Sequence, residues 1–340
     1  MARVAIKSGE KHWTKITAKR GKQTRAAWVC AIGGRKPGPT LALLAGQHGM
    51  EPTGPAILGG LADDLTPFQL SGNLLIVPLV YANAIRHGFE CEPRPGKKRL
   101  LQSYGRWHNQ CPYGADRNKC GRNMNRMWPG DSKGSVYSRL AAALWERVVL
   151  QADYVIDFHC WQDWSPPGVL TTSDEGVELG KWVGVPWIHH NGEDTPLGRT
   201  MLSRNVCLSG RVGITVEFTP QTRIVKDMAE LGRSGIENVM KRLKILPGRA
   251  ERTRPLYLMK GGRWEQVKAE RDVLVLPLIK PGDWVRKNQP LARLVQIDKP
   301  SSASLLKAPF AGVVWSTMPS SAVRAGEPMM LLRDAKRLAK

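Results

Sequence analysis

Over the first 246 residues, short apolar runs typical of strands alternate with longer stretches whose apolar positions recur at helical spacing. Short β-rich apolar runs, typical of buried strands, occupy residues 26–32, 40–45, 74–79, 154–158 and 212–218. Patterns that predict helices cover residues 52–65, 135–151, 174–183 and 221–243. This alternation favours an α/β fold, in which an open, mostly parallel or mixed sheet carries helices on both faces. Ligands of such folds gather at the carboxyl ends of the strands.

Two stretches depart from this alternation. Residues 81–128 are rich in Arg, Gly, Pro and Cys and show little periodicity, which predicts long active-site loops on a rigid sheet. After Leu246-Pro247-Gly248 the pattern becomes all-β, with two similar half-units that each contain a Gly turn and a short apolar strand. A chain of 340 residues exceeds the size at which one core keeps growing. We therefore predict an α/β domain at 1–246 and a small β-barrel-like domain at 247–340.

Three polar side chains stand at the ends of predicted strands. His48 and Glu51 lie in the segment GQHGMEPTG, which follows the apolar run at 41–45, and His159 ends the run at 154–158. We expect these side chains to converge, because ligands gather at this edge of an α/β sheet. Two imidazoles and a carboxylate form a common catalytic zinc site, which keeps one further position open for water. The sequence thus predicts one Zn²⁺ per chain.

A fourth polar side chain, Glu217, lies inside the predicted strand at 212–218. An unpaired carboxylate in a buried strand is costly, but beside an activated water it makes sense as a general base. The alternative is a buried salt bridge to a nearby Arg.

The motifs and their order resemble the succinylglutamate desuccinylase/aspartoacylase family of the zinc carboxypeptidase (M14-like) superfamily. GQHGMEPTG is similar to its Gly-x-x-His-Gly-x-Glu loop, and GRNMNRMWPG at 121–130 is similar to its Asp-x-Asn-Arg-x-(Phe/Trp)-Pro-Gly segment. DFHC and TVEF are similar to its Asp-x-His and Thr-x-Glu motifs. The four motifs in this order are specific, and the resemblance spans roughly residues 38–245. It implies a carboxypeptidase-like mixed sheet flanked by helices.

The resemblance also implies roles for residues of the central loops. Asn125 and Arg126 would hold a substrate carboxylate, which the planar guanidinium fork suits, and a structural salt bridge is the alternative for Arg126. Arg117 would stabilise the oxyanion, with Arg106 and Arg122 as the other candidates.

One position departs from the family pattern. Asn123 replaces the usual Asp that accepts a hydrogen bond from a zinc-binding histidine. An amide oxygen can still accept from an imidazole N–H, although without the negative charge that raises ligand basicity. Asp157, two residues before His159, is another candidate for such a contact.

The function that the resemblance implies is that of a zinc-dependent hydrolase of the deacylase type. It would cleave the amide bond of a small N-acyl amino acid or related carboxylate, with zinc-activated water as the nucleophile. Two alternatives are a metallocarboxypeptidase acting on short or cell-wall peptides and a non-catalytic binding protein on the same scaffold. Trp128, Trp161 and Trp164 near the motifs would line an aromatic-walled pocket or belong to the core.

Charge adds an expectation about partners. The chain has 51 Lys and Arg against 29 Asp and Glu, a formal net charge of +22. The basic residues are scattered, and no nucleic-acid-binding motif accompanies them. We therefore expect a positive surface that attracts a small anionic substrate, rather than a specific nucleic-acid partner.

The remaining composition indicates a soluble cytoplasmic protein with no membrane partner, and a homo-oligomer is compatible with it. The first residues lack a continuous apolar h-region, and no later run is long enough to span a bilayer. The six Cys form no CxxC pair, which favours reduced thiols. In the C-terminal part, whose half-units resemble those of lipoyl- or biotinyl-like barrels, Asp298-Lys299 stands about where carriers keep the modified lysine. Pro300 and the long following gap favour a structural domain instead.

Overall fold

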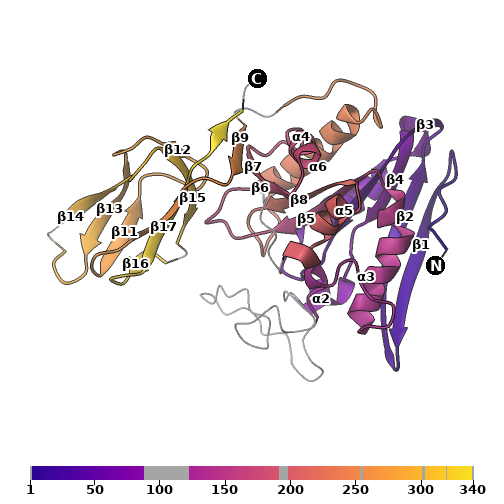
Figure 1. Ribbon diagram of the computed structural model, residues 1–340, viewed down its shortest axis with the longest axis horizontal. Coiled ribbons are helices and arrows are strands. Elements are labelled where there is room, and N and C mark those ends of the chain that lie inside the picture. Colours follow the sequence, from indigo (N-terminus) through magenta and orange to yellow (C-terminus); the bar gives the residue numbers. More distant parts are fainter. Residues whose placement is uncertain are drawn as a thin grey trace.

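The structure, a computed structural model, describes residues 2–87, 122–190, 198–252, 256–300, 303–318 and 320–338. A ten-stranded mixed sheet with helices on both faces forms the larger part, and two four-stranded sheets form the C-terminal part at the other end of the molecule (Figure 1). The predicted α/β class, a large mixed sheet flanked by helices, is confirmed.

The large sheet has the strand order β1-β2-β4-β3-β5-β8-β6-β7-β9-β18. Its central strands β4, β3, β5 and β8 run parallel to one another, whereas β1, β2 and β6 pair antiparallel with their neighbours β2, β4 and β8. The ten strands are β1 Lys11–Arg20, β2 Gln23–Gly33, β3 Lys36–Ala45, β4 Ser71–Val77, β5 Tyr154–Cys160, β6 Gly168–Thr171, β7 Trp187–His190, β8 Val212–Phe218, β9 Tyr257–Lys260 and β18 Lys336–Arg337.

All five predicted strands of the α/β part are present, as β2, β3, β4, β5 and β8. The prediction missed β1, β6 and β7. Strand β1 forms the edge of the sheet and carries charged residues on its exposed face, whereas β6 and β7 have only four residues each. Neither kind of strand produces the long apolar run by which the central strands are found.

The helices are α1 Thr53–Asp64, α2 Ala82–His87, α3 Val136–Arg147, α4 Asp174–Gly180, α5 Leu202–Leu208 and α6 Lys226–Arg242, with short 3₁₀ turns η1 Pro67–Gln69, η2 Met124–Arg126, η3 Val149–Gln151 and η4 Gly198–Thr200. Helices α1, α4 and α6 pack into one apolar core with one face of the sheet, and α3 and α5 pack into a second core with the other face (Figure 1). Helix α6 begins five residues later than predicted, because residues 221–225 form an irregular turn after β8.

Strand β5 shows how the sheet places the polar motif residues. Ile156, Phe158 and Cys160 point into the core that contains α1 and α6, and Phe158 stacks on the ring of Phe218. Since side chains alternate along a strand, Asp157 and His159 lie together on the opposite face.

The C-terminal part consists of the sheets β10-β17-β15-β12 and β14-β13-β11-β16, which share one apolar core. This confirms the predicted all-β character, whereas the boundary at 246/247 and the likeness to a lipoyl or biotinyl barrel stay predictions. The strands are β10 Trp264–Lys268, β11 Val273–Pro277, β12 Trp284–Val285, β13 Pro290–Gln296, β14 Ala303–Lys307, β15 Gly312–Thr317, β16 Ala322–Val323 and β17 Pro328–Arg333.

The C-terminal sheets contact the loop that follows β5. The Trp315 ring meets the Trp161 ring edge-on, with centroids 5.3 Å apart, and the Thr317 N–H donates to the Trp164 carbonyl over 2.9 Å. Arg333 Nη1 lies 2.9 Å from a ring nitrogen of His189. The C-terminal part therefore supports a loop that leads away from a predicted metal ligand.

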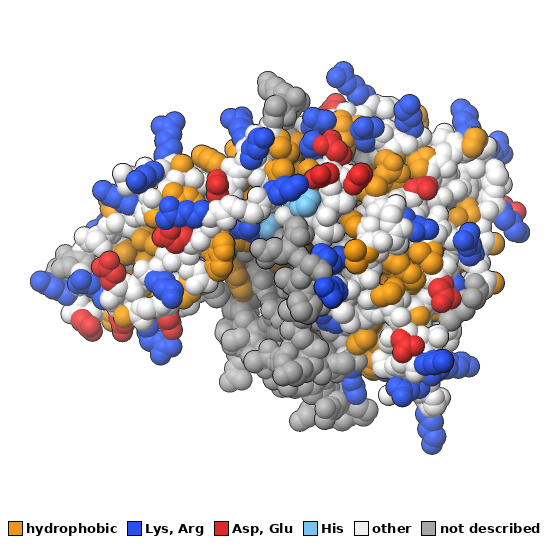
Figure 2. All heavy atoms as spheres, in the orientation of Figure 1, with side chains coloured by type: hydrophobic (Ala, Val, Ile, Leu, Met, Phe, Trp, Pro, Cys, Tyr) orange, Lys and Arg blue, Asp and Glu red, His pale blue; other side chains and the backbone are white. Residues whose placement is uncertain are grey.

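The surface agrees with the expectation of dispersed positive charge. Figure 2 shows Lys and Arg side chains spread over the visible face of both parts rather than gathered in one stripe. Among the residues that the structure describes, no helix is both long and apolar enough to cross a membrane.

Candidate metal centre and active site

The three predicted ligands meet in a buried cluster. His48 Nδ1 lies 2.8 Å from one carboxylate oxygen of Glu51, and His159 Nδ1 lies 2.9 Å from the other. The two Nδ1 atoms are 3.3 Å apart, and one ligand atom from each residue lies within 4.8 Å of the other two. Two imidazole nitrogens and a carboxylate oxygen at this separation could hold one metal ion, and this donor set suits zinc.

Further contacts orient both imidazole rings. His48 Nε2 lies 3.1 Å from Asn123 Oδ1, and His159 Nε2 lies 2.9 Å from Asp157 Oδ2. An Nε2 atom that faces an acceptor is placed to donate its proton there, and this arrangement would leave the lone pair of each Nδ1 for a metal ion. Asn123 thus accepts from His48 as expected from the sequence.

Gln47, which the sequence analysis did not single out, connects the site to the core. Its fully buried amide donates to Asp157 Oδ2 over 2.7 Å and accepts from Trp128 Nε1 over 2.7 Å. The Trp128 indole is therefore part of the support beneath the site rather than of a pocket wall. The signal in the sequence was its place beside His48 in GQHG.

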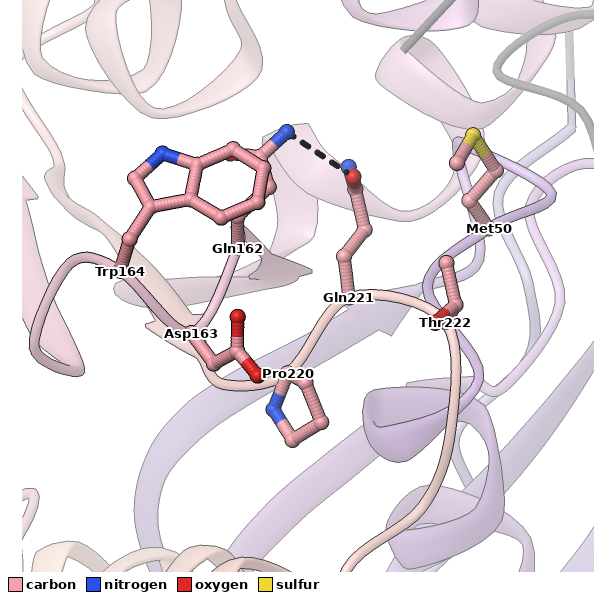
Figure 3. Close-up of a pocket in the computed structure, with 7 residues that line it drawn as sticks. All are labelled: Met50, Gln162, Asp163, Trp164, Pro220, Gln221 and Thr222. Carbon is pink, nitrogen blue, oxygen red and sulfur yellow. Dashed lines mark hydrogen bonds between the residues drawn. The ribbon is translucent and has the colours of Figure 1, made fainter. Parts of the chain in front are cut away.

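A second glutamine, Gln221, was also missed. Its Nε2 donates to Glu51 Oε1 over 3.2 Å, and its Oε1 accepts from Gln162 Nε2 over 3.2 Å. Helical periodicity had assigned Gln221 to the start of a helix, whereas it lies in the turn after β8. This turn brings the carboxylate of Glu51, a predicted metal ligand, into contact with the loop after β5 through Gln221, whose hydrogen bond to Gln162 is drawn in Figure 3.

The buried charges favour a cation in this cluster. Burial opposes ionisation of Glu51, but the imidazoles of His48 and His159 outweigh it and lower the pKa of that carboxyl. Burial likewise opposes protonation of His159, but Asp157 and Glu51 outweigh it and hold the pKa of the imidazole well above its ordinary value. The two carboxylates thus stabilise positive charge at this point, as a cation site requires.

Glu217 lies where the sequence placed it, inside β8. It is the register partner of His159 on the parallel strand β5, so the two side chains share one face of the sheet. Burial raises the pKa of Glu217 from 4.5 to about 8, with His159 opposing the shift and Glu51 and Asp157 adding to it. A carboxyl group with a pKa near neutrality is suited to accept and return a proton.

The residues predicted to bind substrate lie partly beside this cluster. In η2 the Asn125 backbone N–H donates to Asn123 Oδ1 over 2.9 Å, which places Asn125 next to the His48 contact. Arg126 Nη1 donates to the Asn125 carbonyl over 2.9 Å. Arg122 directly precedes Asn123, whereas Arg106 and Arg117 lie outside the described residues.

Comparison with known proteins adds a family and a relative. The succinylglutamate desuccinylase/aspartoacylase catalytic domain matches residues 37–243. The N-alpha-acetyl-L-2,4-diaminobutyric acid deacetylase of Halomonas elongata is 29% identical over 125 residues, which are 37% of this chain and 29% of the relative's length.

Solved structures share the fold over nearly the whole chain. A succinylglutamate desuccinylase/aspartoacylase from Rhodobacter sphaeroides has a TM-score of 0.70 and 20% identity, with 97% of this chain and 96% of that chain covered. The product-bound ectoine utilization protein EutE (DoeB) from Ruegeria pomeroyi has a TM-score of 0.69 and 21% identity, with 96% and 95% covered. Since the family match covers more than half of the chain, this protein belongs to the succinylglutamate desuccinylase/aspartoacylase family of deacylating enzymes.

Proposed function

We propose that this protein is a zinc-dependent hydrolase that cleaves the amide bond of a small N-acyl amino acid or related carboxylate. The observation that carries the proposal is the buried cluster of His48, Glu51 and His159, which has Glu217 as the register neighbour of His159. Three buried ligands beside a carboxyl group of raised pKa are what metal-assisted amide hydrolysis needs.

Zinc, when bound, would supply a Lewis acid and lower the pKa of a water molecule toward neutrality. The residues of the chain orient the groups that would hold the metal ion. Asn123 and Asp157 orient the two imidazoles, and Gln221 holds one oxygen of Glu51.

Glu217 is the proposed proton carrier. Its carboxylate takes a proton from the attacking water and returns it to the amine that leaves when the C–N bond breaks. The raised pKa of Glu217 favours the return of the proton to the amine, and a bound cation would favour the ionised carboxylate that accepts the proton from water.

Arginines are proposed to bind the negatively charged groups of the substrate. We propose that Arg126, with Asn125, holds a substrate carboxylate, because η2 places both residues next to the Asn123–His48 contact. Arg117 is proposed to stabilise the developing oxyanion, with Arg106 and Arg122 as the alternatives.

The relatives support deacylation rather than peptide trimming. The Halomonas elongata relative is named for removing an acetyl group from a small diamino acid. We propose the same reaction class here and treat metallocarboxypeptidase activity and pure binding as outcomes of the test. The C-terminal part is proposed to be a structural domain with a carrier-like fold that supports the loop after β5 and carries no lipoyl group on Lys299.

The test combines metal content with activity. Protein purified without chelator should contain about one zinc per chain, and His48→Ala, Glu51→Ala and His159→Ala should each lose it. His12→Ala, which changes a histidine on the distant edge strand β1, is the matched control and should keep it.

The same preparations should be assayed against a panel of N-acyl amino acids and short peptides. Release of an acid from acyl amino acids supports the proposal. Release of C-terminal amino acids from peptides alone would replace it with the carboxypeptidase function. Zinc-free, inactive wild-type protein would replace it with binding.

A further inference from the structure

A pocket opens at the edge of the large sheet opposite to the metal-ligand cluster. Three segments meet there: the start of β3, the η1 turn and the loop that follows α6. The Ser71 N–H donates to the Ile245 carbonyl over 2.9 Å and so ties the loop after α6 to the start of β4. His48 follows the other end of β3, a strand of 10 residues that spans roughly 30 Å. A ligand in this pocket would therefore lie far from the proposed site of amide cleavage.

The wall of this pocket is strongly basic. Of its 11 described lining residues, 4 are Lys or Arg and none is Asp or Glu, whereas Lys and Arg make up 51 of the 340 residues of the chain. The four are Arg35, Lys36, Lys241 and Lys244. In the part of the chain that the structure describes, none of them forms an ion pair. Four like charges around one hollow repel one another, and an anion between them relieves that repulsion.

Lys244 keeps its charge here in a strained backbone conformation. Helix α6 ends in a Schellman motif, in which the Lys244 N–H donates to the Lys241 carbonyl and the Ile245 N–H donates to the Met240 carbonyl. Lys244 is the left-handed residue of this motif, with a φ of 59°, and glycine adopts that conformation with less strain. Lysines near a helix C-terminus stabilise the helix dipole, which accounts for Lys241. This effect requires neither a left-handed lysine nor the two cations at the start of β3.

The size of the pocket and an aromatic ring in its wall narrow the class of anion. Its volume of about 480 Å³ is in the range of small-molecule sites. Phe68 is 65% exposed, and the Arg35 guanidinium lies over its ring, 4.0 Å from the centroid. An exposed ring beside a guanidinium plane can stack a nucleobase, and ammonium groups bind phosphate as point charges. A single inorganic phosphate would leave this ring and most of the volume unused.

We propose that this pocket binds a nucleotide that carries two or three phosphate groups. The phosphate chain lies among Lys36, Lys241 and Lys244, and the base stacks on Phe68 beside Arg35. The net charge of +22 attracts any anion to the surface, whereas cations gathered in one hollow select a ligand with several negative charges close together. Because this site is separate from the metal centre, the proposal does not depend on the hydrolase function.

Calorimetry on the full-length protein as purified, in about 0.15 M salt, tests the pocket with ATP, inorganic triphosphate and adenosine. ATP should bind roughly fivefold tighter than triphosphate, because its base stacks, and on the order of tenfold tighter than adenosine, which lacks the charges. Lys244→Gly should weaken ATP binding on the order of tenfold, yet keep or raise the thermal stability, since glycine suits the left-handed position. Phe68→Ala should make the affinities for ATP and triphosphate equal.

The matched control is Lys287→Gly, which removes the same charge from an exposed turn of the C-terminal part and should bind ATP as wild type does. If Lys244→Gly binds ATP with full affinity, or if Lys287→Gly loses as much affinity as Lys244→Gly, the attraction belongs to the basic surface in general and the pocket is wrong. Equal affinities of wild type for ATP and triphosphate would overturn the nucleotide assignment.

Two measurements separate this proposal from the hydrolase function. ATP binding that is lost in His48→Ala but kept in Lys244→Gly would place the nucleotide at the metal centre and overturn the pocket. Lys244→Gly should hydrolyse N-acyl amino acids at the wild-type rate, since the pocket lies at the other end of β3. ATP binding with the expected variant pattern, in protein that hydrolyses no acyl amino acid, would keep the pocket and sink the hydrolase proposal.

Discussion

Replacing Glu217 with Gln tests the proposed division between metal ligands and proton carrier. The change removes a proton acceptor and keeps the size of the side chain. Among the described contacts, Glu217 makes no hydrogen bond to His48, Glu51 or His159, so the ligand cluster should stay intact. A positioned general base contributes about 10² to 10⁴ in rate, which corresponds to about 3–5 kcal/mol of transition-state stabilisation.

The same variant should lose activity but gain stability at pH 8, measured as the free energy of unfolding of metal-free protein. The folded-state pKa of Glu217 is raised from 4.5 to about 8, so folded protein binds more protons than unfolded protein between these pH values. Metal-free wild type should therefore lose stability as pH rises from 4.5 to 8, by on the order of a few kcal/mol. Glu217→Gln has no carboxyl group that must ionise there, so the part of the decline that Glu217 causes should be absent, and any decline that remains above pH 6.5 would come from His159, whose pKa is also raised.

The assay has three readouts on one preparation: kcat/KM on a hydrolysed N-acyl amino acid, zinc by elemental analysis, and urea unfolding of metal-free protein at pH 5 and 8. Glu230→Gln, at an exposed position of α6, is the control for loss of a carboxylate. A Glu217→Gln variant that keeps its activity refutes the role as base, and one that loses its zinc makes Glu217 a ligand.

Three further changes test the neighbourhood of the site. Arg126→Lys should weaken use of carboxylate substrates and Arg126→Ala should weaken it more, at high salt as well as low, since a close clamp is screened little; equal rates for all three enzymes would contradict the clamp. Gln221→Leu removes the donor to Glu51 and should lower zinc affinity by about tenfold to a hundredfold, measured by competition with a chelator; unchanged affinity would assign Gln221 to the turn alone. Burial, with the Arg333 charge, lowers the pKa of His189 from 6.5 to about 4, so unfolded protein binds more protons in this range and stability should fall as pH drops from 6.5 toward 4. His189→Gln should flatten that decline in thermal unfolding, and an identical pH profile would show that His189 does not cause it.

The sequence alone predicted where the chemistry of this protein lies along the chain. Apolar runs marked the central strands, and His48, Glu51, His159 and Glu217 stood out because polar residues at strand ends or inside a buried strand need a reason. These signals are local, since a strand's period of two and the cost of a buried charge depend on the immediate neighbours. For the same reason the α/β class and the all-β C-terminal part could be predicted.

The tertiary structure decided which side chains meet. Strand β5 lies between β3 and β8, and this order brings His159 beside both Glu51 and Glu217. Gln47 and Gln221 looked like ordinary loop and helix residues, because all their partners are at least 59 residues away in the chain. Sequence patterns report on neighbours along the chain, whereas these hydrogen bonds depend on strand order and register.

The loop after β5 and the turn after β8 follow the same rule. The turn brings Gln221 against Glu51, and the C-terminal part holds the Trp164 carbonyl through the Thr317 N–H. The sequence therefore determined which residues are candidates for metal binding and proton transfer, and the packing of distant segments decided what surrounds them, because a site is formed by residues that meet only after folding.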